Sequence, residues 1–136
     1  MGAVSVLHEG GDRFRIEMRG HTVTVDQPIP DGGDDVGPTP TELFVASLAS
    51  CVAFYGRRFL RRHRLPQHVS VDVRWELGTS PARVARMELD VEAPGLPAEM
   101  RERFVAVIEH CTVHNSIVDP PEMAIRLTPA PALAVS

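Results

Sequence analysis

The sequence predicts an α+β fold for the 136 residues, arranged as one domain over residues 1–136. Two patterns carry this prediction. Segments in which polar and apolar side chains alternate, typical of half-buried strands, lie both before and after residues 40–62. Residues 40–62 instead repeat apolar side chains with the spacing of a helix. The expected order is three strands, a long helix, two strands, a second helix and a last strand, with antiparallel sheet packed on the long helix.

The first 26 residues are expected to form a small antiparallel meander. Residues 13–19 alternate charged and apolar side chains, as a half-buried strand does. Gly20 allows a tight turn because glycine tolerates positive φ, and residues 22–25 return as the next strand. Residues 4–7 form an earlier strand, which ends before the glycine pair that follows.

Residues 27–38 interrupt this pattern with a run of proline, glycine and aspartate, which indicates a loop. A loop of this length is long for a compact domain. We therefore expect it to be functional, to be mobile, or to cross to another subunit.

The long helix has clear start and stop signals. Thr39 is a good N-cap, the proline after it suits the first helical position, and Glu42 completes the T-x-x-E capping box. Pro66 cannot continue a helix and ends it. Small and apolar residues occupy nearly every position in the first half of the helix, which predicts burial on more than one side.

The second half of the chain repeats the alternation of strands and helix. Residues 69–76 and 85–92 alternate as strands joined by a hairpin-like connection. A second helix follows residues 94–97, with Cys111 on its apolar stripe, and a kinked continuation through Ile117 fits the pattern. Residues 123–127 give the last strand, and the tail after it is expected to be loose.

Composition narrows the functional class. The formal net charge of −4 argues against nucleic acid as a partner, because binding phosphates requires a basic surface. All 14 basic residues are arginine. The N-terminal residues lack the features of a signal peptide, and no apolar run approaches the roughly 18 residues of a membrane helix. We therefore expect a cytoplasmic protein with no membrane partner.

The two cysteines, Cys51 and Cys111, are each expected on the apolar face of a helix, and three interpretations are open. Free cysteine packs as a small hydrophobic residue, so both thiols could fill the core. Thiols from two helices could form a reversible redox pair, because the cytoplasm disfavours a structural disulfide. A metal site is the third interpretation, since His110 and His114 share a helical face, although no C-x-x-C pair is present.

Redox chemistry requires the attacking sulfur to be a thiolate beside a positive charge. Cys51 lies about three turns into its helix, too far from the N-terminus for the helix dipole to stabilise a thiolate. The polar face of the N-terminal strands offers Arg13, with Arg15 and Arg19 as alternatives. Each of these arginines is also explained as part of a solvated strand face.

Two segments of the chain resemble a known family. Residues 38–51, Pro-Thr-Pro-Thr-Glu-Leu-Phe-Val-Ala-Ser-Leu-Ala-Ser-Cys, are similar to the first-cysteine helix of the OsmC/Ohr family, osmotically inducible protein C and organic hydroperoxide resistance protein. Residues 109–117, Glu-His-Cys-Thr-Val-His-Asn-Ser-Ile, resemble its second-cysteine segment. The resemblance extends from about Val4 to Leu127 and is closest to the shorter OsmC-like branch.

The resemblance implies an intertwined homodimer in which two sheets wrap the paired long helices. It also implies thiol-dependent reduction of organic hydroperoxides without a cofactor or metal. Cys51 would attack the peroxide, Cys111 would resolve the sulfenic acid to a disulfide, and an external dithiol would reduce that disulfide. Arg13 of the partner subunit, with Arg15 in reserve, would assist.

The chain departs from the family at one position. Characterised peroxidases of the family carry a glutamate ten residues before the first cysteine, where this sequence has Thr41. Glu42 is one residue later, turned about 100° around the helix, and serves the capping box. The alternative function is therefore a non-catalytic OsmC-like dimer that binds an apolar small molecule between its subunits, with both cysteines structural.

Overall fold

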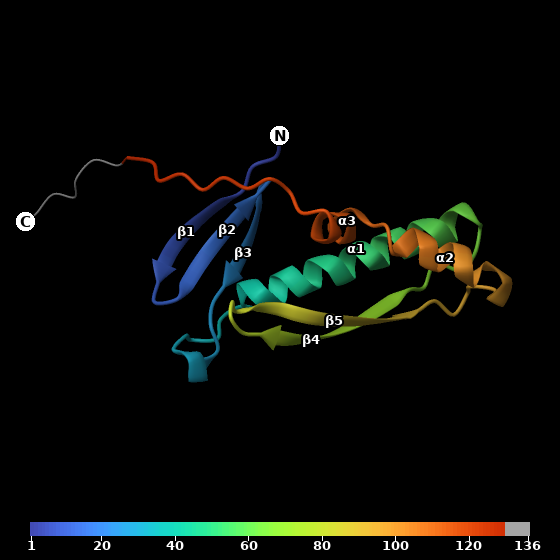
Figure 1. The fold of residues 1–136 in the computed structure, drawn as a ribbon, viewed down its shortest axis with the longest axis horizontal. Coiled ribbons are helices and arrows are strands. Elements are labelled where there is room, and N and C mark those ends of the chain that lie inside the picture. The colour runs from blue at the N-terminus through green and yellow to red at the C-terminus, as the bar shows by residue number, and fades with distance from the viewer. Residues whose placement is uncertain (130–136) are drawn as a thin grey trace, which may run out of the picture.

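The structure is a computed structural model that describes residues 1–129 (Figure 1). Its elements in chain order are β1 (Ser5–Gly10), β2 (Arg13–Met18), β3 (His21–Val25), η1 (Ile29–Asp31), α1 (Pro40–Arg62), β4 (Ser70–Gly78), β5 (Arg83–Glu92), η2 (Ala98–Met100), α2 (Arg101–Ile108) and α3 (Thr112–Val118). The mixed α+β class and the long central helix are confirmed. The predicted loose tail lies mostly outside the described residues.

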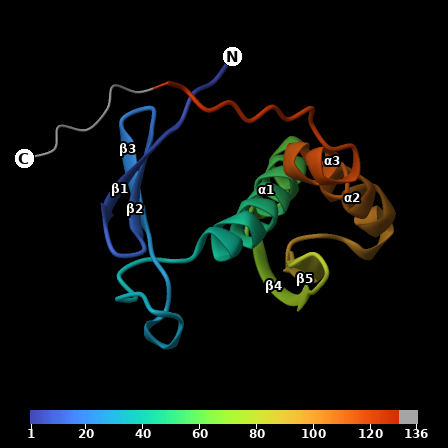
Figure 2. The same cartoon turned by 60° about the vertical axis from the view of Figure 1, so that its left-hand side comes forward.

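Strands β1, β2 and β3 form an antiparallel meander in that order. The turn from β2 to β3 uses Arg19 and Gly20, whose φ angles are 47° and 80°, as the glycine predicted. The sheet stands beside the start of α1, and the chain between Asp26 and Thr39 joins the two (Figure 2). Its apolar face is left open within the chain, with Val6 58% exposed and Phe14 36% exposed.

Helix α1 begins and ends where the sequence predicts. The Thr39 side chain accepts a hydrogen bond from the Glu42 N–H, and the Glu42 carboxylate accepts one from the Thr39 N–H, so the capping box is formed. The helix ends at Arg62, and its last turn carries basic side chains, which favour a helix C-terminus.

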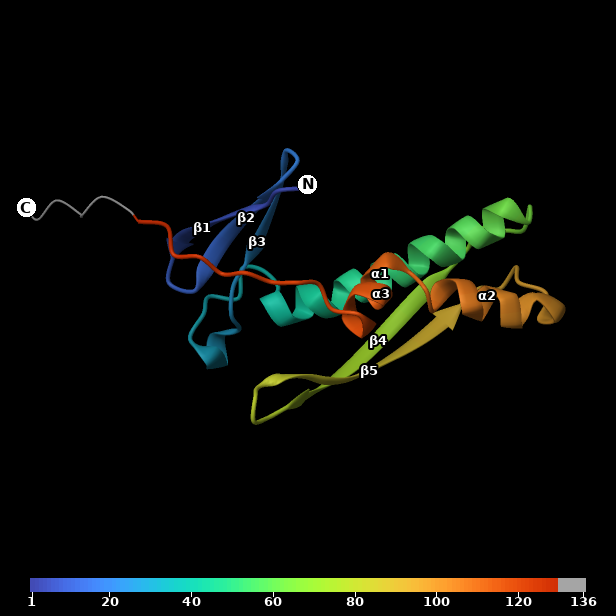
Figure 3. The same ribbon diagram turned by 45° about the horizontal axis from the view of Figure 1, so that its top comes forward.

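The core lies where the β4–β5 hairpin and α2 pack on α1 (Figure 3). Its buried side chains come from α1, from α2 and from the turn after α2: Leu48, Val52, Phe59, Leu60, Phe104, Ile108 and Cys111. Val71, Val91 and other apolar residues of the hairpin cover this cluster from the sheet side.

The loop after β3 is held by one buried carboxylate. Asp26, only 1% exposed, accepts hydrogen bonds from the backbone N–H groups of Gln27, Asp34 and Val36. Gly33 must lack a side chain, because a Cβ there would lie 2.0 Å from the Gln27 carbonyl oxygen. Asp26 therefore organises the segment that the sequence analysis left open as a functional, mobile or crossing loop.

Two details of the sequence prediction are wrong. The last strand over residues 123–127 is not formed, because this segment meets no strand edge within the chain; Ile125 is 100% exposed. The second helix breaks at Cys111, where an extended backbone (φ −70°, ψ 158°) separates α2 from α3. Within the single chain α1 is buried on one side, since Phe44 and Phe54 remain 42% and 54% exposed, and its burial on more than one side in a homodimer stays a prediction.

By length and composition, α1 is the one helix of the described residues that could cross a membrane, with a mean hydropathy of 1.3 over its most apolar stretch. The expectation that no segment reaches this composition is therefore also wrong. The contacts of α1 with the hairpin and α2 explain its apolar character, because a core helix needs the same side chains.

Candidate functional site

Cys51 lies in the middle of α1 and is half-buried. It packs against the edge of the buried core rather than within it. The sequence places it there because Leu48 and Val52, its neighbours on the helix, turn into the core and leave the Cys51 sulfur at the margin. Cys51 therefore keeps part of its surface exposed to solvent.

Cys111 is fully buried at the turn between α2 and α3. It is the N-cap of α3, and its Sγ accepts a hydrogen bond from the His114 N–H at 3.4 Å. The sequence analysis placed Cys111 on the apolar stripe of a helix with a kinked continuation through Ile117, whereas the break puts its side chain at the start of a new helix. Burial and this hydrogen bond together fix the position of the sulfur.

The fold brings the two cysteines together. Both pack in the same apolar cluster, and Cys51 is close enough to raise the pKa of the Cys111 thiol. Both thiols are free. One turn beyond Cys51, the Tyr55 hydroxyl is 2.9 Å from Thr112 Oγ1, the residue after Cys111. This hydrogen bond ties α1 to α3 beside the sulfurs, and the sequence analysis did not predict it.

The surroundings of Cys111 change the pKa of its thiol. Burial raises the pKa of the Cys111 thiol, and the hydrogen bond and charge of Cys51 raise it further, while the N–H groups of His114 and Val113 act in the opposite direction. Cys111 therefore stays protonated at neutral pH. It can donate its proton when it reacts, and its burial limits attack on it from solvent.

The three candidate arginines do not reach the cysteines within the chain. Arg13, the first residue of β2, has its Nη1 3.8 Å from Asp34 Oδ2 in the loop after β3. Arg15 is held more closely, at 3.0 Å from Glu17 and 3.4 Å from Glu9. Arg13 is thus the less restrained of the two and lies at the end of the sheet.

At the start of α1, no carboxylate stands at Thr41, the position where the sequence departs from the family pattern. Glu42 is committed to the capping box, with Oε1 2.9 Å from the Thr39 nitrogen. Thr41 offers no carboxylate. An arginine that approached Cys51 would therefore find no carboxylate at this position of the helix to hold it.

The metal interpretation gains no support. Within residues 1–129, no three histidine, cysteine or acidic side chains are grouped as metal ligands. His110 points its Nδ1–H at the Ala106 carbonyl, 2.7 Å away, which is an ordinary contact within a helix end. The His110 ring is therefore explained by local hydrogen bonding.

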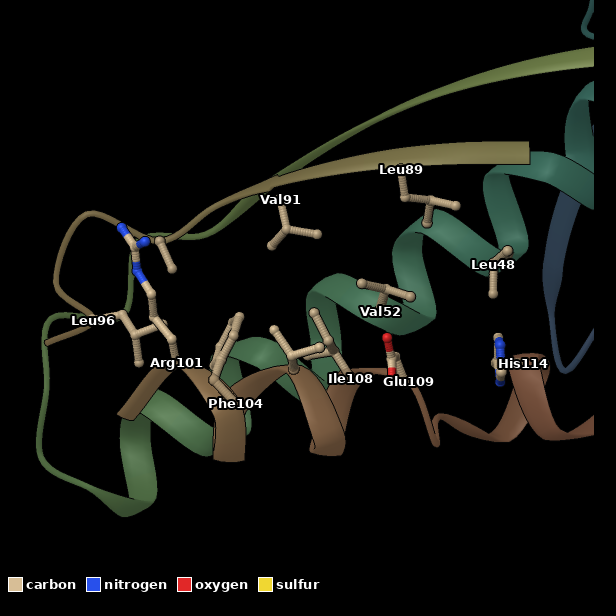
Figure 4. A pocket seen from close by; sticks show the side chains of 12 residues that line it. Leu48, Val52, Leu89, Val91, Leu96, Arg101, Phe104, Ile108, Glu109 and His114 are labelled. Carbon is tan, nitrogen blue, oxygen red and sulfur yellow. The ribbon is translucent and has the colours of Figure 1, made fainter. Parts of the chain in front are cut away.

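A cavity of about 680 Å³ opens between α1, β5 and α2 (Figure 4). Leu48 and Val52 of α1, Leu89 and Val91 of β5, and Phe104 and Ile108 of α2 form its apolar walls. Arg101, Glu109 and His114 are its polar members. Neither cysteine lines this cavity, although its walls include the α1 residues Leu48 and Val52 on either side of Cys51 and the helix that leads into Cys111.

Comparisons with known proteins agree with this fold. The model of the family described as OsmC-like protein matches residues 32–126. A putative osmotic stress induced and detoxification response protein from Psychrobacter arcticus superposes with a TM-score of 0.76 at 20% identity, over 85% of this chain and 88% of that one. An OsmC-like protein from Mycoplasma pneumoniae gives 0.73 at 16% identity, over 88% and 89%.

An organic hydroperoxide resistance protein OsmC from Legionella pneumophila is also similar, with a TM-score of 0.62 at 23% identity, over 86% of this chain and 88% of that one. No curated protein matches the chain. The structural likenesses show the fold, and the family model covers well over half of the sequence, including both cysteines. The chain belongs to the OsmC-like protein family.

Proposed function

We propose that this protein reduces organic hydroperoxides through Cys51 and Cys111. The observation that carries the proposal is the pairing of one accessible thiol with one buried thiol from a different segment. A redox pair needs this asymmetry, because one sulfur must react with the substrate and the other must lie next to it to resolve the sulfenic acid. The name of the Legionella relative, organic hydroperoxide resistance protein, supports the same chemistry.

The reaction uses only the two sulfurs and an external reductant. The Cys51 thiolate attacks the terminal oxygen of the hydroperoxide, forming an S–O bond as the O–O bond breaks, and the alkoxide takes up a proton to leave as alcohol. The Cys111 sulfur then attacks the Cys51 sulfenic acid, forming the disulfide and releasing water with the Cys111 proton. A dithiol restores both thiols by exchange. No metal or organic cofactor takes part.

The cation that stabilises the thiolate comes from a second copy of the chain in this proposal. The open apolar face of the β1–β3 sheet and the exposed Phe44 and Phe54 of α1 support a homodimer, since a partner would cover them. Arg13 sits at the end of that sheet and would approach the partner's cysteine, with Arg15 in reserve. The cytoplasm, whose reducing poise regenerates thiols, is the compartment that suits this cycle.

The test adds cumene hydroperoxide to reduced protein and counts thiols. The wild type should lose both thiols of each chain and form one disulfide. Cys111→Ser should consume one equivalent of peroxide and stop as a sulfenic acid that dimedone labels. Cys51→Ser should consume none, and consumption at the wild-type rate would overturn the assignment. Arg13→Gln should slow the first step while the variant still ends with one disulfide per chain.

A second candidate function rests on the apolar cavity of about 680 Å³. An OsmC-like dimer could bind an apolar small molecule there with both cysteines inert, and the absence of a carboxylate at Thr41 favours this reading. Modification of Cys51 by a thiol reagent as a function of pH separates the two functions. A midpoint above about 8.5, the value of a free thiol, would favour the binding protein.

A further inference from the structure

A second cavity, of about 380 Å³, lies between the C-terminal half of α1 and the outer face of α2. Three rings of α1 at every fourth position, those of Tyr55, Phe59 and His63, line it on one side. Ala106 and Val107 of α2 line it on the other. Neither cysteine contributes to its wall, so it is distinct from the proposed redox site.

Three arginine side chains, all of them exposed to solvent, line this cavity. Arg58 and Arg62 come from α1, and Arg103 comes from α2. Among residues 1–129 none of the three forms an ion pair, and no carboxylate lines the cavity. Arg74, by contrast, is paired with both Glu88 and Asp90 on the hairpin. The cavity therefore concentrates positive charge that the described part of the chain leaves uncompensated.

Helix stability does not explain this cluster. Arg62 lies at the C-terminus of α1, where a cation is favourable. Arg103 lies in the first turn of α2, where a cation opposes the helix dipole. Like charges gathered at one place also repel one another. An anion bound among the three would relieve both costs.

The wall of the cavity is suited to a flat molecule. The Arg58 guanidinium lies over the Tyr55 ring, 4.9 Å from its centroid. The rings of Phe59 and His63 are stacked, with centroids 4.1 Å apart and an interplanar angle of 28°. His63 donates its Nδ1–H to the Phe59 carbonyl at 2.9 Å, which leaves Nε2 free for a ligand. Aromatic rings and guanidinium planes both stack on planar π-systems.

We propose that this cavity binds a planar aromatic carboxylate. The ring would lie against Tyr55 and His63, and the carboxylate would take charge-assisted hydrogen bonds from Arg58 and Arg103, whose forked geometry matches it. A cavity of about 380 Å³ is within the range of small-molecule pockets, roughly 300–1,000 Å³. This site is independent of the hydroperoxide chemistry, because it needs no reaction at either sulfur.

The test titrates 2-naphthoate into the reduced full-length protein and follows its fluorescence. Saturable binding at one site per chain is expected. Arg58→Gln and Arg103→Gln should each weaken binding about tenfold, as the loss of a charge-assisted hydrogen bond predicts. The matched control is Arg61→Gln, which removes the same charge from the same helix but does not line the cavity. Cys51→Ser should bind like the wild type, whatever its effect on peroxide.

Four results would overturn the proposal. The first is the absence of saturable 2-naphthoate binding. The second is equal weakening of binding by Arg61→Gln, which would mean that net charge alone attracts the probe. Binding of uncharged 2-naphthamide as tightly as 2-naphthoate would remove the anion site. Equal binding of octanoate, which carries the charge without the ring, would remove the preference for an aromatic ligand. Circular dichroism of each variant, with the same spectrum as wild type, confirms that folding is unchanged.

Discussion

Replacing Gly56 by alanine tests how closely α1 packs on α2. Gly56 is buried in α1, and a Cβ built there would lie 3.1 Å from Cζ of Phe104 and 3.4 Å from Cγ2 of Val69. The Phe104 ring cannot retreat freely, because it is only 3% exposed and meets the Phe59 ring edge-on at a centroid distance of 5.4 Å. The added methyl group therefore requires the Phe104 ring or its helix to shift by a few tenths of an ångström.

The expected free energy follows from two opposing effects. Alanine in place of glycine inside a helix stabilises it by about 1 kcal/mol. Overpacking a close-packed core costs about 1–3 kcal/mol. We expect Gly56→Ala to lower the free energy of unfolding by up to about 2 kcal/mol, because Phe104 cannot yield. In a Phe104→Leu background the clash with the ring is absent, so the same substitution should instead stabilise the protein by up to about 1 kcal/mol.

Urea unfolding of the four reduced proteins, at one fixed protein concentration, gives the double-mutant cycle. A change of sign between the two backgrounds supports the packing account. Stabilisation by Gly56→Ala in the wild-type background, or the same effect in both backgrounds, would refute it. Because α2 leads directly into Cys111, the same variant should also slow formation of the disulfide after peroxide is added.

Three further predictions concern single groups. Because the pKa of Cys111 is raised in the folded protein, its contribution to stability should be complete below about pH 9 and lost as the pH rises through the folded value. Urea unfolding of the wild type between about pH 8 and 10 should show this fall in the free energy of unfolding. Cys111→Ala should not show it. Burial raises the pKa of Asp26, but three backbone hydrogen bonds outweigh it, so the net shift of the pKa is downward. The contribution of Asp26 to stability is therefore complete above about pH 4 and lost as the pH falls through the folded value. Asp26→Asn should remove this dependence in an acid titration followed by circular dichroism. Thr41→Glu should increase the rate of cumene hydroperoxide consumption severalfold. Glu42→Gln should lower the melting temperature without that gain in rate, because it weakens the capping box. An unchanged rate in Thr41→Glu would show that a carboxylate at this position is unimportant.

The elements whose signals are local could be predicted. The capping box at Thr39 and Glu42, the stop before Pro66 and the alternation of the five formed strands all depend on neighbouring residues, and the structure has each of them. The last strand over residues 123–127 could not be predicted correctly, because its alternation is real but a strand exists only beside another strand. The break at Cys111 was missed because the apolar spacing runs across it without a proline or glycine.

The amino-acid sequence by itself determined the family of this protein, the long central helix and the two cysteines of the proposed redox pair. It could not assign their different environments, since burial is a property of the packed chain. Only the tertiary structure decided that Cys51 is half-buried and Cys111 fully buried, and that a hydrogen bond from Tyr55 to Thr112 joins their two segments. It also decided that Arg58, Arg62 and Arg103 line one cavity. The physical reason is that α1 and α2 are distant in the sequence, so contacts between them depend on how the whole core packs and not on any local pattern.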